Sequence, residues 1–184
     1  MKVSLYTVCR GRLDHLRKTL PHNEASGAEL VVVGSGPGLR EFMNGRPSRF
    51  IEDAGPWNVN RLRNRALEQT TGDIVINTDA DNYVGPLSIE HAEETFTNWL
   101  PGIKHMIRGR NSRGQHGRIG FHRAALLALG GWSEEHGTPD HMARGADITT
   151  TIRAAKRQGF TWTRWPKSEI QHIDHPQGAT DARP

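Results

Sequence analysis

The sequence predicts an α/β fold, in which a mostly parallel β-sheet is flanked by helices, and three observations indicate it. Apolar, β-branched segments of strand length alternate along the chain with amphipathic segments of helical period. The apolar segments are continuous, which is typical of strands that are buried on both faces. No internal repeat or linker interrupts this alternation, so a single sheet covered by helices accounts for the pattern.

Local signals at the ends of the predicted elements support them. Pro21 is expected to stop the first helix, Asn58 is an N-cap for the second, and Gly72 closes it. The Gly130-Gly131 pair ends a shorter helix. The predicted strands are residues 2–8, 29–33, 49–51, 73–79 and 160–165, the last by its alternation. The predicted helices are residues 12–20, 59–71, 86–99, 123–129 and 146–157.

The remaining residues are predicted to be loops within a single domain. Residues 132–144 are polar, and residues 108–123 combine five arginines with four glycines, which is typical of a mobile basic loop that leads into a short strand. A chain of 184 residues suits one core. We therefore expect a single domain over residues 1–176 and a flexible tail over residues 177–184.

The composition argues against several classes of protein. The lone Cys9 cannot form an intramolecular disulfide, which excludes a disulfide scaffold and favours a reducing compartment. No apolar segment approaches the roughly 20 residues that span a bilayer, and no signal-peptide pattern is present. We therefore expect a soluble, cytoplasmic protein. The net charge is +4, and only five of the 24 basic residues are lysines. This arginine bias fits a phosphate-rich ligand, and GC-rich coding explains it equally well.

Two carboxylates follow the apolar strand of residues 73–79, in the segment Asp79-Ala80-Asp81. In an open α/β sheet, ligands bind beyond the carboxyl ends of the strands. Carboxylate oxygens suit Mg²⁺ or Mn²⁺, and such an ion can in turn hold a diphosphate. The alternative interpretation of this spacing is a solvated turn with a helix cap.

Two further patterns have both a chemical and a structural interpretation. His172 and His175 lie three residues apart after a predicted strand, and imidazoles beside a carboxylate suit Mn²⁺ or Zn²⁺. The alternative is a pair of surface histidines near a tail. Asp147 begins a predicted helix, where the macrodipole favours an ionised carboxylate that can accept a proton. The alternative is a helix cap.

Taken together and in order, these parts resemble the GT-A glycosyltransferases, both the large family 2 and the β-1,4-galactosyltransferases. The resemblance extends from about residue 3 to residue 176. The matching motifs are a basic turn at Cys9-Arg10-Gly11-Arg12, an N-R-x-x-x-N helix at residues 60–65, the D-x-D, a G-G-W segment at residues 130–132 and an acidic helix start at Asp147.

The resemblance implies a single-domain, GT-A-like (Rossmann-like) fold and a metal-dependent, inverting transfer of a sugar from a nucleotide-diphosphate donor, in particular a UDP-sugar. Asp147 would be the general base. The metal, Mn²⁺ or Mg²⁺, would be held by Asp79, Asp81, His172 and His175, with Asp81 the more direct ligand. The residues that would contact the donor are Arg10, Arg12, Asp53, Arg61, Asp79 and Trp132, the last facing the donor sugar or the acceptor.

The chain departs from the family pattern at two positions that bear on substrates. Residues 33–36 read Val-Gly-Ser-Gly where many members carry an aspartate for the nucleoside, so Asp53 on the following loop is the candidate substitute. Ala146 replaces the glutamate that precedes the base. The chain also lacks the extra segments that shape the acceptor site, so that site is expected to be minimal or completed by a partner.

Two other functions compete with this hypothesis. A basic nucleic-acid-binding module would bind DNA or RNA through Arg108, Arg110, Arg113, Arg118 and Arg123, although Phe121 is the only aromatic residue in that segment. A sugar nucleotidyltransferase would carry a glycine-rich phosphate loop after the first strand, where this chain has only Gly11. The acceptor of a glycosyltransferase could be a glycan, a protein or a hydroxylated DNA base.

Overall fold

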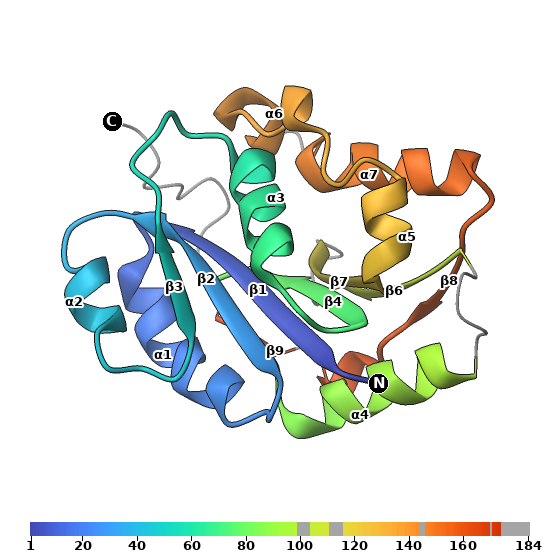
Figure 1. The fold of residues 1–184 in the computed structure, drawn as a ribbon, viewed down its shortest axis with the longest axis horizontal. Coiled ribbons are helices and arrows are strands. Elements are labelled where there is room, and N and C mark those ends of the chain that lie inside the picture. Colours follow the sequence, from blue (N-terminus) through green and yellow to red (C-terminus); the bar gives the residue numbers. More distant parts are fainter. Residues whose placement is uncertain (99–103, 111–115, 144–145, 170, 174–184) are drawn as a thin grey trace.

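A seven-stranded sheet forms the centre of the computed structural model, which describes residues 1–98, 104–110, 116–143, 146–169 and 171–173. Its strand order is β3-β2-β1-β4-β7-β6-β8 (Figure 1). These strands are β1 (Val3–Arg10), β2 (Glu29–Ser35), β3 (Arg49–Glu52), β4 (Ile74–Thr78), β6 (His105–Arg110), β7 (His116–His122) and β8 (Thr161–Arg164). A two-stranded antiparallel ribbon consists of β5 (Asn82–Tyr83) and β9 (Gln171–His172).

Most neighbouring strands of the large sheet run parallel, as predicted. β1 is parallel to both β2 and β4, β2 is parallel to β3, and β6 is parallel to β8. Only β7 runs the other way, because it pairs antiparallel with β4 and with β6. The parallel strands β1, β2 and β4 therefore end at the same edge of the sheet.

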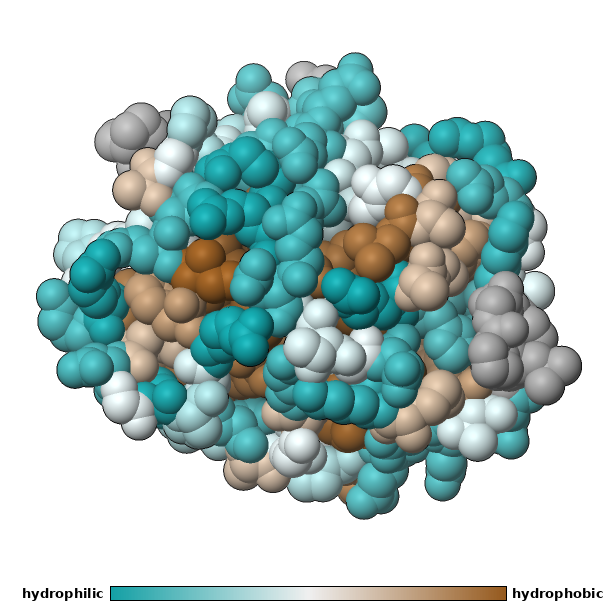
Figure 2. All heavy atoms as spheres, in the orientation of Figure 1, coloured by the Kyte–Doolittle hydropathy of each residue, from teal (hydrophilic) through white to brown (hydrophobic). Residues whose placement is uncertain are grey.

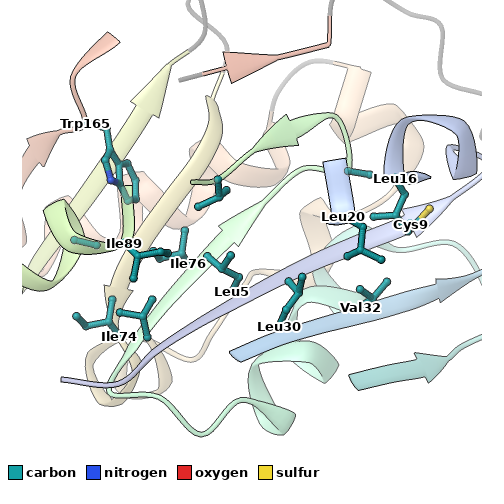
Figure 3. Packing of buried hydrophobic residues seen from close by; sticks show 14 of the residues in the cluster. Leu5, Cys9, Leu16, Leu20, Leu30, Val32, Ile74, Ile76, Ile89 and Trp165 are labelled. Atoms are coloured by element: carbon teal, nitrogen blue, oxygen red, sulfur yellow. The ribbon is translucent and has the colours of Figure 1, made fainter. Parts of the chain in front are cut away.

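Helices cover both faces of the sheet, and each face has its own apolar core. The helices are α1 (Leu13–Glu24), α2 (Leu39–Met43), α3 (Val59–Gln69), α4 (Pro86–Thr97), α5 (Arg123–Ala128), α6 (Pro139–Ala143) and α7 (Ala146–Arg157), with short 3₁₀ turns at Glu134–His136 and Lys167–Glu169. One core joins the sheet to α1, α2 and α4, and Leu16, Leu20 and Ile89 show its packing in Figure 3. The other joins the sheet to α3, α5 and α7. Neighbouring residues of β1 alternate between the two cores, as a pleated strand requires.

The prediction that Pro21 ends the first helix is wrong, because α1 continues to Glu24. Proline removes one backbone donor, a loss that tertiary contacts of the last turn offset here. Asn23 is buried and donates from Nδ2 to the Asn82 carbonyl at 3.1 Å, and its Oδ1 accepts the Val84 N–H at 2.6 Å. These bonds hold the last turn of α1 in place.

The prediction of a mobile basic loop over residues 108–123 is also wrong for the part that the structure describes. Residues 105–110 and 116–122 are the strands β6 and β7, and they pair with each other inside the sheet. Glycine has low strand propensity, so packing against neighbouring strands decides the outcome here. Gly120 shows this contact directly, since an added Cβ would lie 2.8 Å from the Ile107 side chain.

Other predictions agree with the structure or lie outside the residues it describes. Asn58 caps α3 by accepting the Arg61 N–H at 3.0 Å, as predicted, although the helix closes at Thr70 and not at Gly72. The polar segment of residues 132–144 contains a 3₁₀ turn and α6. The predicted tail, residues 177–184, is outside the described residues. No helix among those described is both long and apolar enough to cross a membrane.

Gly34 explains why this chain has no aspartate at the end of β2. A Cβ at this position would lie 1.8 Å from the Cys9 carbonyl oxygen and 2.8 Å from its carbon, both backbone atoms of the neighbouring strand. The close approach leaves no space for a side chain of any kind. The segment at residues 33–36 therefore has no position for the aspartate that the resembled family carries at the end of this strand.

We predict that Gly34→Ala lowers the free energy of unfolding by about 3 kcal/mol or more, because two paired strands must separate to admit the methyl group. Urea unfolding followed by circular dichroism measures the loss. Gly85→Ala is the matched control, since its added Cβ meets only the end of the His22 side chain at 3.2 Å. Equal stability of the two variants would contradict the close approach at Gly34.

Candidate functional site

The predicted site residues gather at the edge of the sheet where β1 and β4 end. Arg10 is the last residue of β1 and Arg12 follows it, while Asp79 and Asp81 follow β4. The position beyond the carboxyl ends of parallel strands is where open α/β sheets bind ligands. The edge therefore brings together two arginines and two carboxylates from strands that are neighbours in space.

The Asp81 side chain contacts three others, those of Arg12, Asn82 and His172. Its Oδ2 is 3.1 Å from Arg12 Nη1 and 3.4 Å from His172 Nε2, and its Oδ1 accepts a hydrogen bond from Asn82 Nδ2 at 2.7 Å. The β5–β9 ribbon produces this arrangement, since Asn82 pairs with His172 and the Ile173 N–H donates to the Asp81 carbonyl at 2.8 Å. The structure thus brings together Asp81 and His172, which are far apart in sequence.

Asp79 is the more solvent-accessible carboxylate of the pair. Desolvation by the surrounding protein and the negative charges of Asp81 and Asp147 raise the pKa of Asp79 to about 7, against the opposing effect of Arg63 and Arg12. Its side chain is still 40% exposed, so a cation or a phosphate group can reach it. The site therefore carries more negative charge than its own arginines neutralise.

The donor set fits a divalent cation that is completed by a phosphate ligand. Among the described residues, no group of three histidine, cysteine, aspartate or glutamate side chains is placed to hold a metal by itself. Asp81 and His172 supply one carboxylate and one imidazole, and Mg²⁺-type ions are commonly bound by one or two carboxylates plus substrate phosphates. His175, the fourth predicted ligand, lies outside the described residues.

Arg63 lies at the centre of the polar contacts behind these carboxylates. Its Nη1 donates to Asp147 Oδ2 and to Asn60 Oδ1, both at 2.8 Å, and its Nε donates to Asn77 Oδ1 at 3.2 Å. Its Nη2 is 3.6 Å from Asp79 Oδ1. Only 3% of Arg63 is exposed. One guanidinium therefore joins α3, the end of β4 and the start of α7.

Sequence reasoning missed Arg63, although a signal for it was present. The predicted donor contact in this helix was Arg61, whereas Arg63 appeared only as part of the motif. Helical spacing places Arg63 on the same face as Val59, Asn60 and Ala66, which is the buried face. An arginine on the apolar side of an amphipathic helix needs buried partners, and that requirement was the available signal.

Asp147 is buried at the start of α7 and faces Arg63, as a positioned carboxylate would. Its backbone is fixed as well, because Asn60 Nδ2 donates to the Asp147 carbonyl at 3.0 Å and to the Ser133 carbonyl at 2.8 Å. Asp147 and Asp79 thus approach the same guanidinium from two different elements. The predicted base and the D-x-D belong to one site.

Asp53 and Arg61, which were predicted to contact the donor, contact each other. Arg61 Nη1 and Nη2 each donate to one Asp53 oxygen at 2.8 Å, and Arg65 donates to the same carboxylate. Hydrogen bonds from Arg61 hold the pKa of Asp53 well below its usual range. The Asp53–Arg61 pair stabilises the loop after β3. The Gly55 carbonyl in this loop also accepts a hydrogen bond from Arg10 at 3.1 Å.

The prediction that Trp132 faces a sugar is wrong, because its side chain is 1% exposed. Its indole N–H donates to the Tyr6 hydroxyl at 2.8 Å inside the core, and Arg63 lies over its ring at 5.1 Å. Gly131, with φ of +71°, turns the chain inward at this point, and Asn64 holds the Trp132 backbone N–H and carbonyl. The buried Trp132 ring therefore packs against the Arg63 guanidinium.

The arginines through which the competing nucleic-acid-binding module would bind DNA are partly internal. Arg118 is 0% exposed and donates to Ser88 Oγ at 2.7 Å and to the carbonyls of Tyr83 and Glu169, so it is not available to a phosphate. Burial lowers the pKa of Arg118 to about 10. Arg108 is buried too, whereas Arg123 is partly exposed. Arg113 and the side chain of Arg110 lie outside what the structure describes.

Comparison with solved structures shows the fold of the chain. The mannosyltransferase PcManGT from Pyrobaculum calidifontis, in complex with GDP-Man and Mn²⁺, matches 92% of this chain with a TM-score of 0.68 and 19% identity. TarS from S. aureus matches 89% with a TM-score of 0.64 and 14% identity, and its complex with UDP-GlcNAc matches 89% with a TM-score of 0.63 and 16% identity. The predicted GT-A fold is thereby confirmed.

The chain is shorter than these proteins. It spans 56% of the mannosyltransferase chain and 58% and 56% of the two TarS chains. No protein-family model matches the sequence, and no curated protein matches it.

We predict that Arg63→Met lowers the free energy of unfolding by about 3 kcal/mol, because it leaves the buried Asp147 carboxylate without its partner. In the Arg63→Met variant, Asp147→Asn should lower the free energy of unfolding by less than it does in the wild type. Urea unfolding of the wild type, the two single variants and the double variant should give a coupling energy above about 1 kcal/mol. Arg40→Met, at an arginine whose side chain is 71% exposed, is the control and should change stability by less than about 0.5 kcal/mol. Additive losses in the cycle would show that the two groups do not interact.

Proposed function

We propose that the chain is a metal-dependent, inverting glycosyltransferase that moves a sugar from a nucleotide-diphosphate donor, in particular a UDP-sugar, to an acceptor hydroxyl. One observation carries the proposal: in a GT-A fold, Asp81 with His172 and Asp147 with Arg63 lie at the edge where β1 and β4 end. The acceptor classes that remain are a glycan, a protein and a hydroxylated DNA base.

The reaction requires two separate charged groups, and the site offers both. The acceptor oxygen forms a bond to the anomeric carbon while the bond from that carbon to the diphosphate breaks, so the leaving group takes the electron pair. Asp147 takes the proton of the acceptor hydroxyl. A Mn²⁺ or Mg²⁺ ion bound through Asp81 and His172 would neutralise the charge that develops on the diphosphate. A single displacement of this kind inverts the configuration at carbon.

The surrounding residues orient these groups. Arg63 fixes the orientation of Asp147, since its Nη1 donates to Asp147 Oδ2 at 2.8 Å. Arg12 fixes Asp81, and the β5–β9 ribbon presents His172 to the same oxygen. Arg10, at the end of β1 and over the Trp57 ring at 5.6 Å, borders the position of the donor nucleotide.

Two features bear on the alternatives and on the compartment. Between β1 and α1 the only glycine is Gly11, so the chain does not present the glycine-rich phosphate loop of a sugar nucleotidyltransferase. Cys9 is buried and its thiol is free, which supports our proposal that the protein works in the reducing cytoplasm.

We predict that a nucleotide sugar binds in a Mn²⁺- or Mg²⁺-dependent manner and that Asp81→Ala abolishes this binding. Isothermal titration across a panel of UDP-, GDP- and other nucleotide sugars, with Mn²⁺, Mg²⁺ or EDTA, measures it. Asp14→Ala removes a carboxylate whose side chain is 89% exposed on α1 and should bind as the wild type does. Binding of no nucleotide sugar by the folded wild type would refute the proposed function.

We predict that Asp147→Asn lowers turnover of the donor found in that panel by about 10² to 10⁴, because the acceptor proton loses its base. Donor hydrolysis or transfer to an added acceptor gives the rate, and circular dichroism verifies folding. Asp140→Asn, an exposed residue of α6, is the matched control and should keep the wild-type rate. Near-normal turnover by folded Asp147→Asn would remove Asp147 from this role.

A further inference from the structure

Positive charge is concentrated in one stretch of the chain that the proposed reaction does not use. Residues 148–168 contain five basic residues and no aspartate or glutamate. The stretch runs from the body of α7, through β8, to the turn that follows. Arg153, Lys156 and Arg157 are exposed on α7, and Arg164 is exposed on β8. A strand and a helix of the same domain thus present cations without acidic neighbours in sequence.

The fold places this stretch at one edge of the molecule. β8 is the last strand in the order of the large sheet, and α7 lies beside it on one face (Figure 1). Hydrophilic residues cover the outer side of α7 in the space-filling view (Figure 2). β8 lies three strands from β4, which corresponds to about 14 Å at the usual strand spacing. The surface is therefore separate from the candidate catalytic site.

An exposed tryptophan lies at the centre of these cations. Trp162 of β8 is 39% exposed. The Arg164 and Arg108 guanidinium carbons lie 5.0 and 5.1 Å from the centre of its ring, and the Lys156 ammonium lies at 5.7 Å. Lys104 extends the same surface, because its ammonium donates to the Gln158 carbonyl at 3.0 Å. We call Trp162 with the exposed Lys156 and Arg164 the tryptophan surface; Arg108 lies against the ring but is buried.

The positive charge of this surface is not neutralised locally. Within the part of the chain that the structure describes, neither Arg164 nor Lys156 forms an ion pair. Each cation gains about 0.5 to 1 kcal/mol from an exposed ring, but the cations repel one another. An anionic ligand would relieve that repulsion.

We propose that the tryptophan surface binds single-stranded nucleic acid, with phosphates on the cations and a base against the Trp162 ring. Proteins that bind single strands combine a positively charged path for the backbone with aromatic rings on which bases stack. Arginine adds bidentate contacts to phosphate oxygens. An acidic protein or an anionic polysaccharide would bind the cations but has no base that stacks on an indole. A single strand of nucleic acid is the partner that would contact both the cations and the Trp162 ring.

The test is fluorescence anisotropy with two labelled probes of about 20 nucleotides, oligothymidylate and an abasic strand with the same number of phosphates. Wild-type protein should bind oligothymidylate more tightly than the abasic strand. Trp162→Ala should weaken oligothymidylate binding about fivefold or more and leave the abasic strand unaffected, because one stacked base is lost. Trp162→Phe, which keeps an aromatic face, should restore part of the preference.

A double variant tests the cations independently of the ring. Lys156→Ala with Arg164→Ala should lower affinity for both probes and reduce the slope of log K against log salt by about 1.4, or 0.7 for each lost phosphate contact. Arg17→Ala with Lys18→Ala also removes two positive charges, but from α1, which packs on the other face of the sheet. That control should keep the wild-type slope.

Two results would overturn the proposal. Equal wild-type affinity for the two probes would show binding by charge alone, and equal losses in the two double variants would show that net charge, rather than this surface, attracts the strand. The assay contains no nucleotide sugar and no metal, so its outcome is independent of the proposed glycosyltransferase activity.

Discussion

The site depends on one physical constraint, which is that a buried guanidinium must have its donors satisfied. Arg63 projects from α3 into the interior, where each unmet donor would cost about 1 to 3 kcal/mol. Asn60, Asn77 and Asp147 accept from its Nε and Nη1 groups and belong to α3, β4 and α7, while its Nη2 lies 3.6 Å from Asp79 Oδ1. These elements are brought together by chain topology, but the guanidinium decides which atoms meet. The position of Asp147, the candidate base, therefore follows from the hydrogen bonds that the buried Arg63 requires.

Charge balance explains why this framework suits a phosphate-bearing substrate. Asp79, Asp81 and Asp147 are opposed by only two nearby arginines, Arg12 and Arg63. The negative charge that these arginines do not balance lies at Asp79, the carboxylate that solvent can reach. A divalent cation bound together with a diphosphate would supply the missing positive charge. Under the proposed function, binding of the donor and completion of the metal site would be the same event, which fits a described donor set too small to retain a metal alone.

Elements with local causes could be predicted from the sequence, and those with distant causes could not. The strands β1, β2 and β4 follow from continuous apolar segments, and the start of α3 follows from the Asn58 cap. Asp79 and Asp81 could be placed because the end of a parallel strand is a known ligand position. Nothing local shows that Asn23 sustains α1 beyond a proline. Nothing local shows that Trp132 turns inward or that β6 and β7 pair across an arginine-rich segment. The partners of Asn23 and Trp132 lie more than 50 residues away, and the pairing of β6 with β7 depends on packing inside the sheet, so each is known only once the fold exists.

The arginine bias of the chain takes on a different meaning once these partners are known. In the sequence it fits a phosphate-rich ligand and GC-rich coding equally well, and in the structure several arginines are buried in the interior. Arg118 joins β7 to the carbonyls of Tyr83 and Glu169, and so anchors the ribbon that carries His172. Arg63 and Arg12 hold Asp147 and Asp81 in the same way. A planar guanidinium with five donors can join several elements at once, which a lysine cannot do. Composition therefore cannot separate framework arginines from ligand-binding ones, whereas position can. Lys156 and Arg164 beside Trp162 are exposed and form no ion pair within the described residues.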